Sequence, residues 1–181
     1  MLLFYLIIPL IIKPIPCPAW VSCLDNYIPF TWWMIIPYYF YYVIIIIPPF
    51  MLKKNKTINF LTDKLIMISV VCYLAYFFWP ITSTDILMQV EANKLFFMHR
   101  AITFEYLNQN AFPSMHVAVS WLIGLVIIHE DSSKKPVLFI AIISIFLATF
   151  LTKQHYIVDS IAGLFLGYIG FWSYKKSLYS N

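Results

Sequence analysis

Charge is the scarcest property of this sequence. Only 12 of its 181 residues are basic and 8 are acidic, so that charged residues make up 11% of the chain, against about 25% in an average soluble protein. Hydrophobic residues make up 62%, which is more apolar surface than a soluble domain of this size buries. The composition therefore excludes a disordered chain and almost any soluble fold, and it indicates a protein that lies in lipid.

The few basic residues form no dense block. The formal net charge is only +4, and lysines and arginines are scattered along the whole sequence. A nucleic-acid-binding arm needs a run of like charges. We therefore expect membrane lipids as partners and no nucleic acid, and the sequence predicts no oligomeric state.

Cysteine and glycine are rare as well. The cysteines are Cys17, Cys23 and Cys72, and no C-x-x-C spacing is present, which argues against a zinc site built from thiolates. Cys17 and Cys23 lie close enough to pair in an oxidising compartment, or they are two separate small apolar residues. With four glycines there is no Gly/Ser linker and no internal repeat, so that we expect residues 1–181 to form one domain.

What the sequence has instead is long apolar runs. A helix needs about 20 apolar residues to cross a bilayer, with a lower limit near 17. The two longest runs are Phe30–Met51 and Ile58–Pro80, and shorter ones are Pro113–Ile128, Val137–Leu151 and Tyr156–Tyr174. We expect helices, because hydrocarbon offers no partner to an unpaired backbone group. Tryptophans and tyrosines between positions 32 and 42 are predicted to anchor the interface or to pack within their span.

The first twelve residues, MLLFYLIIPLII, form a further apolar run. It resembles the core of a signal peptide, but no basic residue precedes it and no small-residue cleavage site follows it. We interpret it as a short or imperfect first span. The fold prediction is therefore an all-α, multi-pass membrane bundle of about six transmembrane helices, or five if this run does not span.

The loop charges orient the predicted spans. Eight basic residues follow the second, fourth and sixth predicted spans, namely Lys53, Lys54, Lys56, Lys64, Lys134, Lys135, Lys175 and Lys176. The opposite side carries only four, namely Lys13, Lys94, Arg100 and Lys153. Because cytoplasmic loops are enriched in Lys and Arg, we place the eight inside the cell and the second group on the extracytoplasmic face of the cell (inner) membrane. Six spans would put both ends of the chain inside.

Two histidines begin predicted spans on that outer side. His116 begins the span after Pro113, and His155 directly precedes the last one. The N-terminal end of a helix favours an anion such as phosphate. His155 and Asp159 are four residues apart and share one helical face, so that the carboxylate can fix the imidazole tautomer and leave the other nitrogen free to attack. The alternative is a structural His–Asp pair that joins two helices.

His116 stands two residues after Ser114. A histidine opposite the nucleophile can protonate a departing alkoxide, and the serine hydroxyl with nearby backbone amides can hold phosphate oxygens. A third interpretation of His116, His155 and Asp159 is a zinc site with one open position, which their spacing alone leaves open.

The combination of motifs is more specific than its parts. A-F-P-S-M-H-V-A is followed after about 30 residues by T-K-Q-H-Y-I-V-D-S-I-A-G, and together they resemble the type 2 phosphatidic acid phosphatase superfamily, a family of six-helix bundles. F-P-S-M-H and K-Q-H-Y are most similar to its inositol phosphorylceramide synthase-like branch. The stretch Leu24-Asp25-Asn26-Tyr27-Ile28-Pro29-Phe30, with Pro37-Tyr38 further on, also resembles that branch, so that the resemblance covers about residues 24–170.

The resemblance implies a role for each matching residue. His155 would attack phosphorus and form a phosphohistidine, Asp159 would orient it, His116 would protonate the leaving group, and Ser114 would bind phosphate. No metal and no other cofactor takes part in this mechanism.

The chain also departs from the superfamily pattern. Thr149 stands where the wider superfamily has an arginine, and the motif K-x(6)-R-P is absent, because Lys94 and Arg100 are spaced one residue short. Two-pronged clamping of phosphate by arginine is thus partly lost. We expect Lys94, Arg100 and Lys153, the cations of the outer side, to compensate as phosphate ligands; otherwise they contact lipid headgroups or solvent.

These patterns predict a membrane-embedded enzyme that acts on a lipid phosphate. If water takes the phosphoryl group from His155, the enzyme is a phosphatase, and if an alcohol takes it, a phosphotransferase. The alternative is a non-catalytic multi-pass protein, such as a scaffold or transporter subunit, in which His155 and Asp159 form a structural or proton-relay pair.

Overall fold

The all-α prediction is confirmed in the computed structural model, which describes residues 2–87, 89–103 and 112–179. Within these residues the elements are helices and short 3-10 turns, and the only extended pairing is an isolated bridge between Ile15 and Ile81. In chain order they are α1 (Leu2–Ile11), α2 (Ala19–Asn26), η1 (Trp32–Met34), α3 (Ile35–Ile46), α4 (Pro48–Met51), α5 (Asn55–Phe78), α6 (Thr84–Leu87), α7 (Phe96–Ile102), α8 (Met115–Glu130), η3 (Ser132–Lys134), α9 (Lys135–Leu151) and α10 (Ile157–Tyr179).

The five predicted internal spans all appear as helices. Asn55–Phe78, Ser132–Leu151 and Ile157–Tyr179 are long and apolar enough to cross a membrane, and Trp32–Ile46 and Met115–Glu130 are shorter apolar helices. The N-terminal run is different, because α1 has only 10 residues and rises about 15 Å, half the thickness of the hydrocarbon core. The described α1 is thus too short to span the bilayer by itself, which agrees with the five-span form of the prediction. The side of the membrane on which each end of the chain lies stays a prediction.

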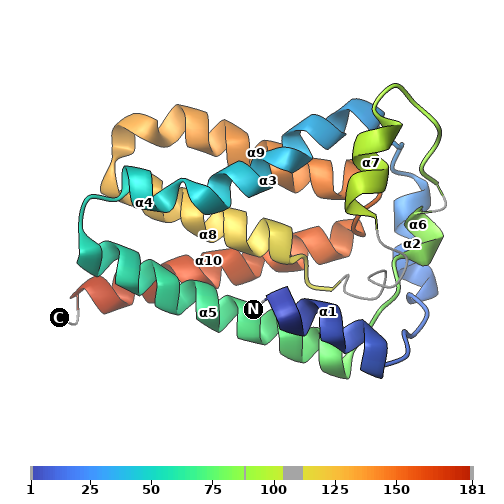
Figure 1. Cartoon of the computed structure of the whole chain (residues 1–181), viewed down its shortest axis with the longest axis horizontal. Helices are drawn as coiled ribbons and strands as arrows, with labels where there is room; N and C mark the ends of the chain where they lie inside the picture. The colour runs from blue at the N-terminus through green and yellow to red at the C-terminus, as the bar shows by residue number, and fades with distance from the viewer. Residues whose placement is uncertain (1, 88, 104–111, 180–181) are drawn as a thin grey trace.

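The long helices run side by side along the bundle (Figure 1). The closest pair is α8 with α10, and α9 and α5 pack on this pair from either side, while α3 packs against α9 and α8. The short helices α2, α6 and α7 gather at one end of the bundle, and α1 covers the part of α5 nearest that end (Figure 1). Residues 88 and 104–111 of the stretch between α5 and α8 lie outside the described residues.

The bundle is apolar on its outside as well as in its core. Buried side chains such as Ile68, Leu122 and Ile142 form the interior, whereas Phe165 and Trp172 of α10 are about 60% exposed (61% and 60%). Soluble proteins rarely expose such continuous apolar faces, and lipid is the solvent that they suit. Together with the three long apolar helices, this makes the chain an integral membrane protein.

Three of the four glycines lie on the face of α10 that meets α8. At Gly167 a Cβ atom would lie 2.6 Å from the carbonyl oxygen of Ala118 and 2.9 Å from the Cβ of Trp121, and at Gly163 it would meet the carbonyl oxygen of Ser114. Gly163 and Gly167 form the G-x-x-x-G spacing that lets two helices approach backbone to backbone in lipid. Because Gly163 and Gly167 have no side chains, the beginning of α8 can pack directly against the first turns of α10.

The glycine contact gives a first testable prediction. Gly167→Ala should push α8 away from α10 and lower the apparent melting temperature of the purified protein in detergent by roughly 5 °C. The matched control is Tyr168→Ala, because the neighbouring Tyr168 is exposed on the lipid side. Equal melting temperatures for the two variants would show that α8 and α10 tolerate a wider spacing.

Candidate active site

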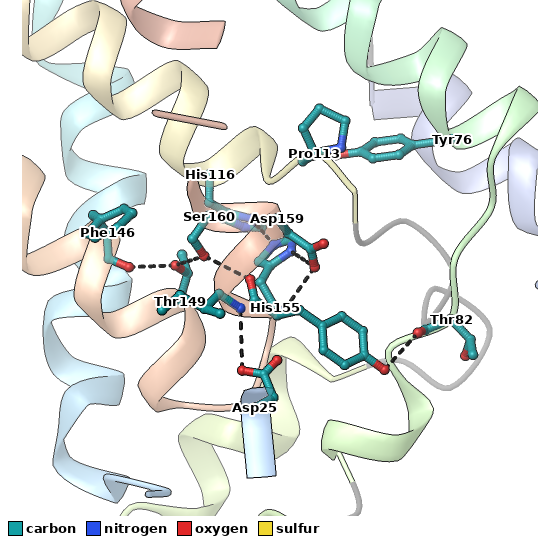
Figure 2. Close-up of polar contacts among 12 residues, drawn as sticks. Asp25, Tyr76, Thr82, Pro113, His116, Phe146, Thr149, His155, Asp159 and Ser160 are labelled. Carbon is teal, nitrogen blue, oxygen red and sulfur yellow. Dashed lines mark hydrogen bonds and ion pairs between the residues drawn. The ribbon is translucent and has the colours of Figure 1, made fainter. Parts of the chain in front are cut away.

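The two histidines that begin predicted spans meet at the end of the bundle that carries α2, α6 and α7. His116 lies in the first turn of α8, and His155 lies in the loop between α9 and α10, one turn before Asp159. His116 Nδ1 is 3.2 Å from His155 Nε2, and His155 Nδ1 is 3.7 Å from Asp159 Oδ2 (Figure 2). Two ring nitrogens at hydrogen-bonding distance share one proton, so that one imidazole donates while the other offers its lone pair.

Asp159 is held in place by the beginning of its own helix. It is 2% exposed, and its Oδ2 accepts a hydrogen bond of 2.9 Å from the backbone N–H of Tyr156. A carboxylate at the first turn of a helix interacts favourably with the unpaired amides there. The same oxygen is therefore fixed on the side of the His155 ring opposite to His116.

Ser114 precedes α8 and lies directly against Asp159. Its backbone N–H donates to the carbonyl oxygen of Asp159 at 2.9 Å, and its side chain is fully buried. Within the described part of the chain, Ser114 Oγ has no hydrogen-bond partner. A buried hydroxyl without a partner is costly, and this one lies two residues before His116, where a bound phosphate oxygen would satisfy it.

Tyr38 of α3 completes a row of polar groups through the bundle. Its hydroxyl is 3.0 Å from His116 Nε2, and the rings of Tyr38 and Tyr41 lie 5.0 and 4.4 Å from the His116 ring. The sequence does not reveal this contact, because tyrosines at these positions equally suit the membrane interface or packing within the span. The one feature of the sequence that points to Tyr38 is the pair Pro37-Tyr38, which belongs to the part of the chain that resembles the superfamily.

Lys153, a predicted phosphate ligand, is bound to backbone carbonyl groups in the structure. Its side chain is 1% exposed, and Nζ donates to the carbonyl oxygens of Asp25 at 2.8 Å and Ile28 at 2.7 Å. Its backbone has a φ of 59°, the left-handed region that costs a side-chain-bearing residue about 1 kcal/mol. Lys153 thus joins the loop that carries His155 to the end of α2. The predicted contact of Lys153 with phosphate stays a prediction.

Asp25 is a second buried carboxyl of this region, and no sequence motif predicts a role for it. Its Oδ1 accepts a 3.4 Å hydrogen bond from the N–H of Ile157, the first residue of α10 (Figure 2). Its Oδ2 is buried without a hydrogen-bond partner among the described residues. Burial raises the pKa of Asp25 from 3.8 to about 6, although the charge of Lys153 opposes this shift.

The two other predicted phosphate ligands lie on the surface. Lys94 precedes α7 and Arg100 lies on it, and both side chains are exposed. Among the described residues neither is brought into a hydrogen bond or ion pair with the histidines or Ser114. Between them, His99 is buried with Nε2 3.1 Å from the carbonyl oxygen of Trp32, which fixes α7 to the beginning of α3.

Thr149 stands where the wider superfamily carries arginine, and it serves helix packing. It is fully buried, and its Oγ1 donates to the carbonyl of Phe146 at 2.7 Å and meets Ser160 Oγ at 2.8 Å (Figure 2). Its own carbonyl accepts the N–H groups of Gln154 and His155. Thr149 therefore shapes the loop that presents His155, with its side chain turned into the contact between α9 and α10.

An apolar pocket of about 130 Å³ opens beside Asp159. Its walls include the aromatic rings of Trp20, Trp79 and Phe112. The described part of the chain has no group of three or more His, Cys, Asp or Glu arranged to hold a metal ion. Cys17, which also lines the pocket, and Cys23 are both free thiols.

A sequence profile of the PAP2 superfamily matches residues 14–173. The chain belongs to the PAP2 superfamily. The match includes Ser114, His116, His155 and Asp159 and agrees with the superfamily that the motifs resemble, but it does not reach the level of a branch. No curated protein and no solved structure matches the chain. PAP2 proteins generally hydrolyse phosphate esters, so that membership indicates a phosphatase or phosphotransferase.

The buried carboxyl of Asp25 gives a prediction on pH. Because the pKa of Asp25 is about 6 in the folded protein and 3.8 ordinarily, the folded state binds the proton more tightly than the unfolded one. Protonated Asp25 therefore contributes to the free energy of unfolding at low pH, and this contribution is lost as the pH rises from about 4 through 6.

Asp25→Asn cannot ionise at this position, so its stability should rise relative to that of the unaltered protein as the pH rises. The gain should reach about 2–3 kcal/mol at pH 7 relative to pH 4, measured as the difference between the thermal stabilities of the two proteins at each pH. A difference that stays constant from pH 4 to pH 7 would contradict a raised pKa.

Proposed function

We propose that this PAP2 protein cleaves a lipid phosphate ester through a phosphohistidine at His155. The observation that carries the proposal is the direct contact of His116 Nδ1 with His155 Nε2 at 3.2 Å, with Asp159 behind His155. One imidazole lies beside a carboxylate and contacts a second imidazole at the position that a phosphoryl group would take between them. This is the arrangement that an attacking base and a proton donor need.

In the first step, His155 Nε2 attacks phosphorus. The N–P bond forms while the bond from phosphorus to the ester oxygen breaks, and the proton on His116 Nδ1 passes to the departing oxygen. Ser114 Oγ and the amides at the beginning of α8 bind the phosphoryl oxygens. The cations Arg100, Lys94 and Lys153 stabilise the negative charge, either by direct contact or through their electrostatic field. The phosphoryl group replaces the present contact between the two rings.

In the second step, an oxygen nucleophile attacks the phosphohistidine. Its proton passes to His116 Nδ1, the N–P bond breaks, and His155 is restored. Water yields free phosphate, and an alcohol yields a new phosphate ester. The similarity of F-P-S-M-H and K-Q-H-Y to the inositol phosphorylceramide synthase-like branch is the reason to test alcohol acceptors.

A lipid substrate suits the surroundings of the site. The pocket beside Asp159 is walled by aromatic rings, and the outside of the bundle is apolar. The lysine-rich turns before α5 and around η3 lie at the opposite end of the bundle from His155 (Figure 1). By the positive-inside rule, the site faces the extracytoplasmic side of the cell membrane.

One observation favours the non-catalytic alternative. Lys153 Nζ is occupied by two carbonyl oxygens, and Lys94 and Arg100 are exposed, so that no described cation touches the histidines. Under this alternative, His155 and Asp159 only join α10 to its neighbours, and the protein releases no phosphate from any ester.

The nucleophile is tested by substitution of His155. His155→Ala should lower kcat for phosphate release from lipid phosphates by at least about 10³-fold, because no other group forms the N–P bond. The measurement is a panel of lipid phosphates, with and without alcohol acceptors, on purified protein. His129→Ala is the control, because His129 lies at the far end of α8. Full activity of His155→Ala would refute the mechanism.

The proton donor is tested by the choice of leaving group. His116→Ala should lower kcat/KM for octyl phosphate by about 10²-fold or more, because an alkoxide leaves poorly without a proton. Its effect on 4-nitrophenyl phosphate should be much smaller, because nitrophenolate leaves unprotonated. Equal losses on the two esters would show that His116 does not protonate the leaving group.

A further inference from the structure

The hydroxyl of Tyr38 lies on the far side of His116 from His155. It is 3.0 Å from His116 Nε2, while His116 Nδ1 is 3.2 Å from His155 Nε2. Tyr38 is 3% exposed. Both nitrogens of the His116 ring thus have a polar partner, one on α3 and one in the loop before α10.

Two tyrosines on one face of α3 contact the His116 ring. Tyr38 and Tyr41 are three residues apart and so lie on the same side of the helix, and both rings contact the His116 ring, at 5.0 and 4.4 Å between centroids. Tyrosine faces attract a positively charged ring. Two aromatic rings of α3 therefore pack on the His116 ring, and one hydroxyl meets its Nε2.

We propose that Tyr38 is a positioning residue that keeps the transferable proton of His116 on Nδ1, the nitrogen that faces His155. The inference rests on the function proposed above, and it assigns to α3 a part in catalysis. Tyr38 does not touch the reacting atoms; it acts through His116.

The donor and acceptor roles follow from the chemistry of the cycle. To give up the Nδ1 proton and be left as a neutral ring, His116 has to enter the first step as an imidazolium, with a proton on each nitrogen. Its Nε2–H donates to the Tyr38 oxygen throughout, while Nδ1–H passes its proton to the leaving oxygen and later takes one from the entering water or alcohol. A hydroxyl oxygen can accept from Nε2–H, and in the cycle proposed here this contact favours the tautomer in which only Nδ1 exchanges its proton. Asp159 Oδ2 lies 3.7 Å from the other nitrogen of His155, Nδ1, where a carboxylate favours a proton on that nitrogen.

Without the hydroxyl, Nε2–H has lost the acceptor that holds the ring. Tyr38→Phe keeps the aromatic ring beside His116 and removes only the oxygen. The charged form of His116 is then stabilised less, and its proton is delivered less well to an ester oxygen that needs it. The attack of His155 on phosphorus is left intact.

The experiment compares kcat/KM on octyl phosphate and 4-nitrophenyl phosphate. Tyr38→Phe should lose about tenfold on octyl phosphate and less than about twofold on 4-nitrophenyl phosphate, whose leaving group needs no proton. Tyr42→Phe, on the exposed side of the same helix, is the matched control and should change neither value. Retained turnover of the nitrophenyl ester shows that the variant is folded.

A double-mutant cycle tests whether Tyr38 acts through His116. In the His116→Ala background, Tyr38→Phe should have no further effect on octyl phosphate, because the group it positions is gone. Equal losses on both esters, no loss on either, or full additivity with His116→Ala would each overturn the proposed role of Tyr38 while leaving the phosphohistidine mechanism in place. Absence of turnover of both esters by the unaltered protein would instead overturn the proposed function and this inference with it.

Discussion

The close approach of α8 and α10 is the constraint on which the rest of the structure depends. In lipid, helices gain nothing from leaving water, so that they associate through close packing and hydrogen bonds. Gly163 and Gly167 permit this packing, and the N–H of Ser114 reaches the carbonyl oxygen of Asp159. This one hydrogen bond joins the beginnings of the two helices. The distance between His116 and His155 follows from it.

The loop between α9 and α10 is held from outside its own helices. Lys153 donates to the end of α2, and Asp25 of α2 accepts from the first N–H of α10. A catalytic side chain on a loop needs such support, because small displacements of reacting atoms cost much of the rate. Buried charge, which lipid makes expensive, is therefore concentrated where α2 meets the segment that carries His155.

The sequence predicted the parts of this structure that depend on local pattern. Apolar run length predicted the five internal helices. The spacing of His155 and Asp159 predicted that they meet, although His155 lies in the loop before α10 and not on the helix itself. The sequence left open whether the first twelve residues span the membrane, and the ten residues of α1 are too few to do so alone. The roles of Lys153, Asp25 and Tyr38 depend on contacts between segments up to 132 residues apart, which no local pattern records.

The central claim, that His155 carries the phosphoryl group, is tested most directly by trapping the intermediate. The purified protein is incubated briefly with a lipid phosphate labelled with ³²P, denatured in base, and mapped for the labelled residue. We predict a label on His155 that is stable in base and labile in acid, and that is absent from His155→Ala. Phosphate release without any label on His155, or a label that survives His155→Ala, would contradict the account.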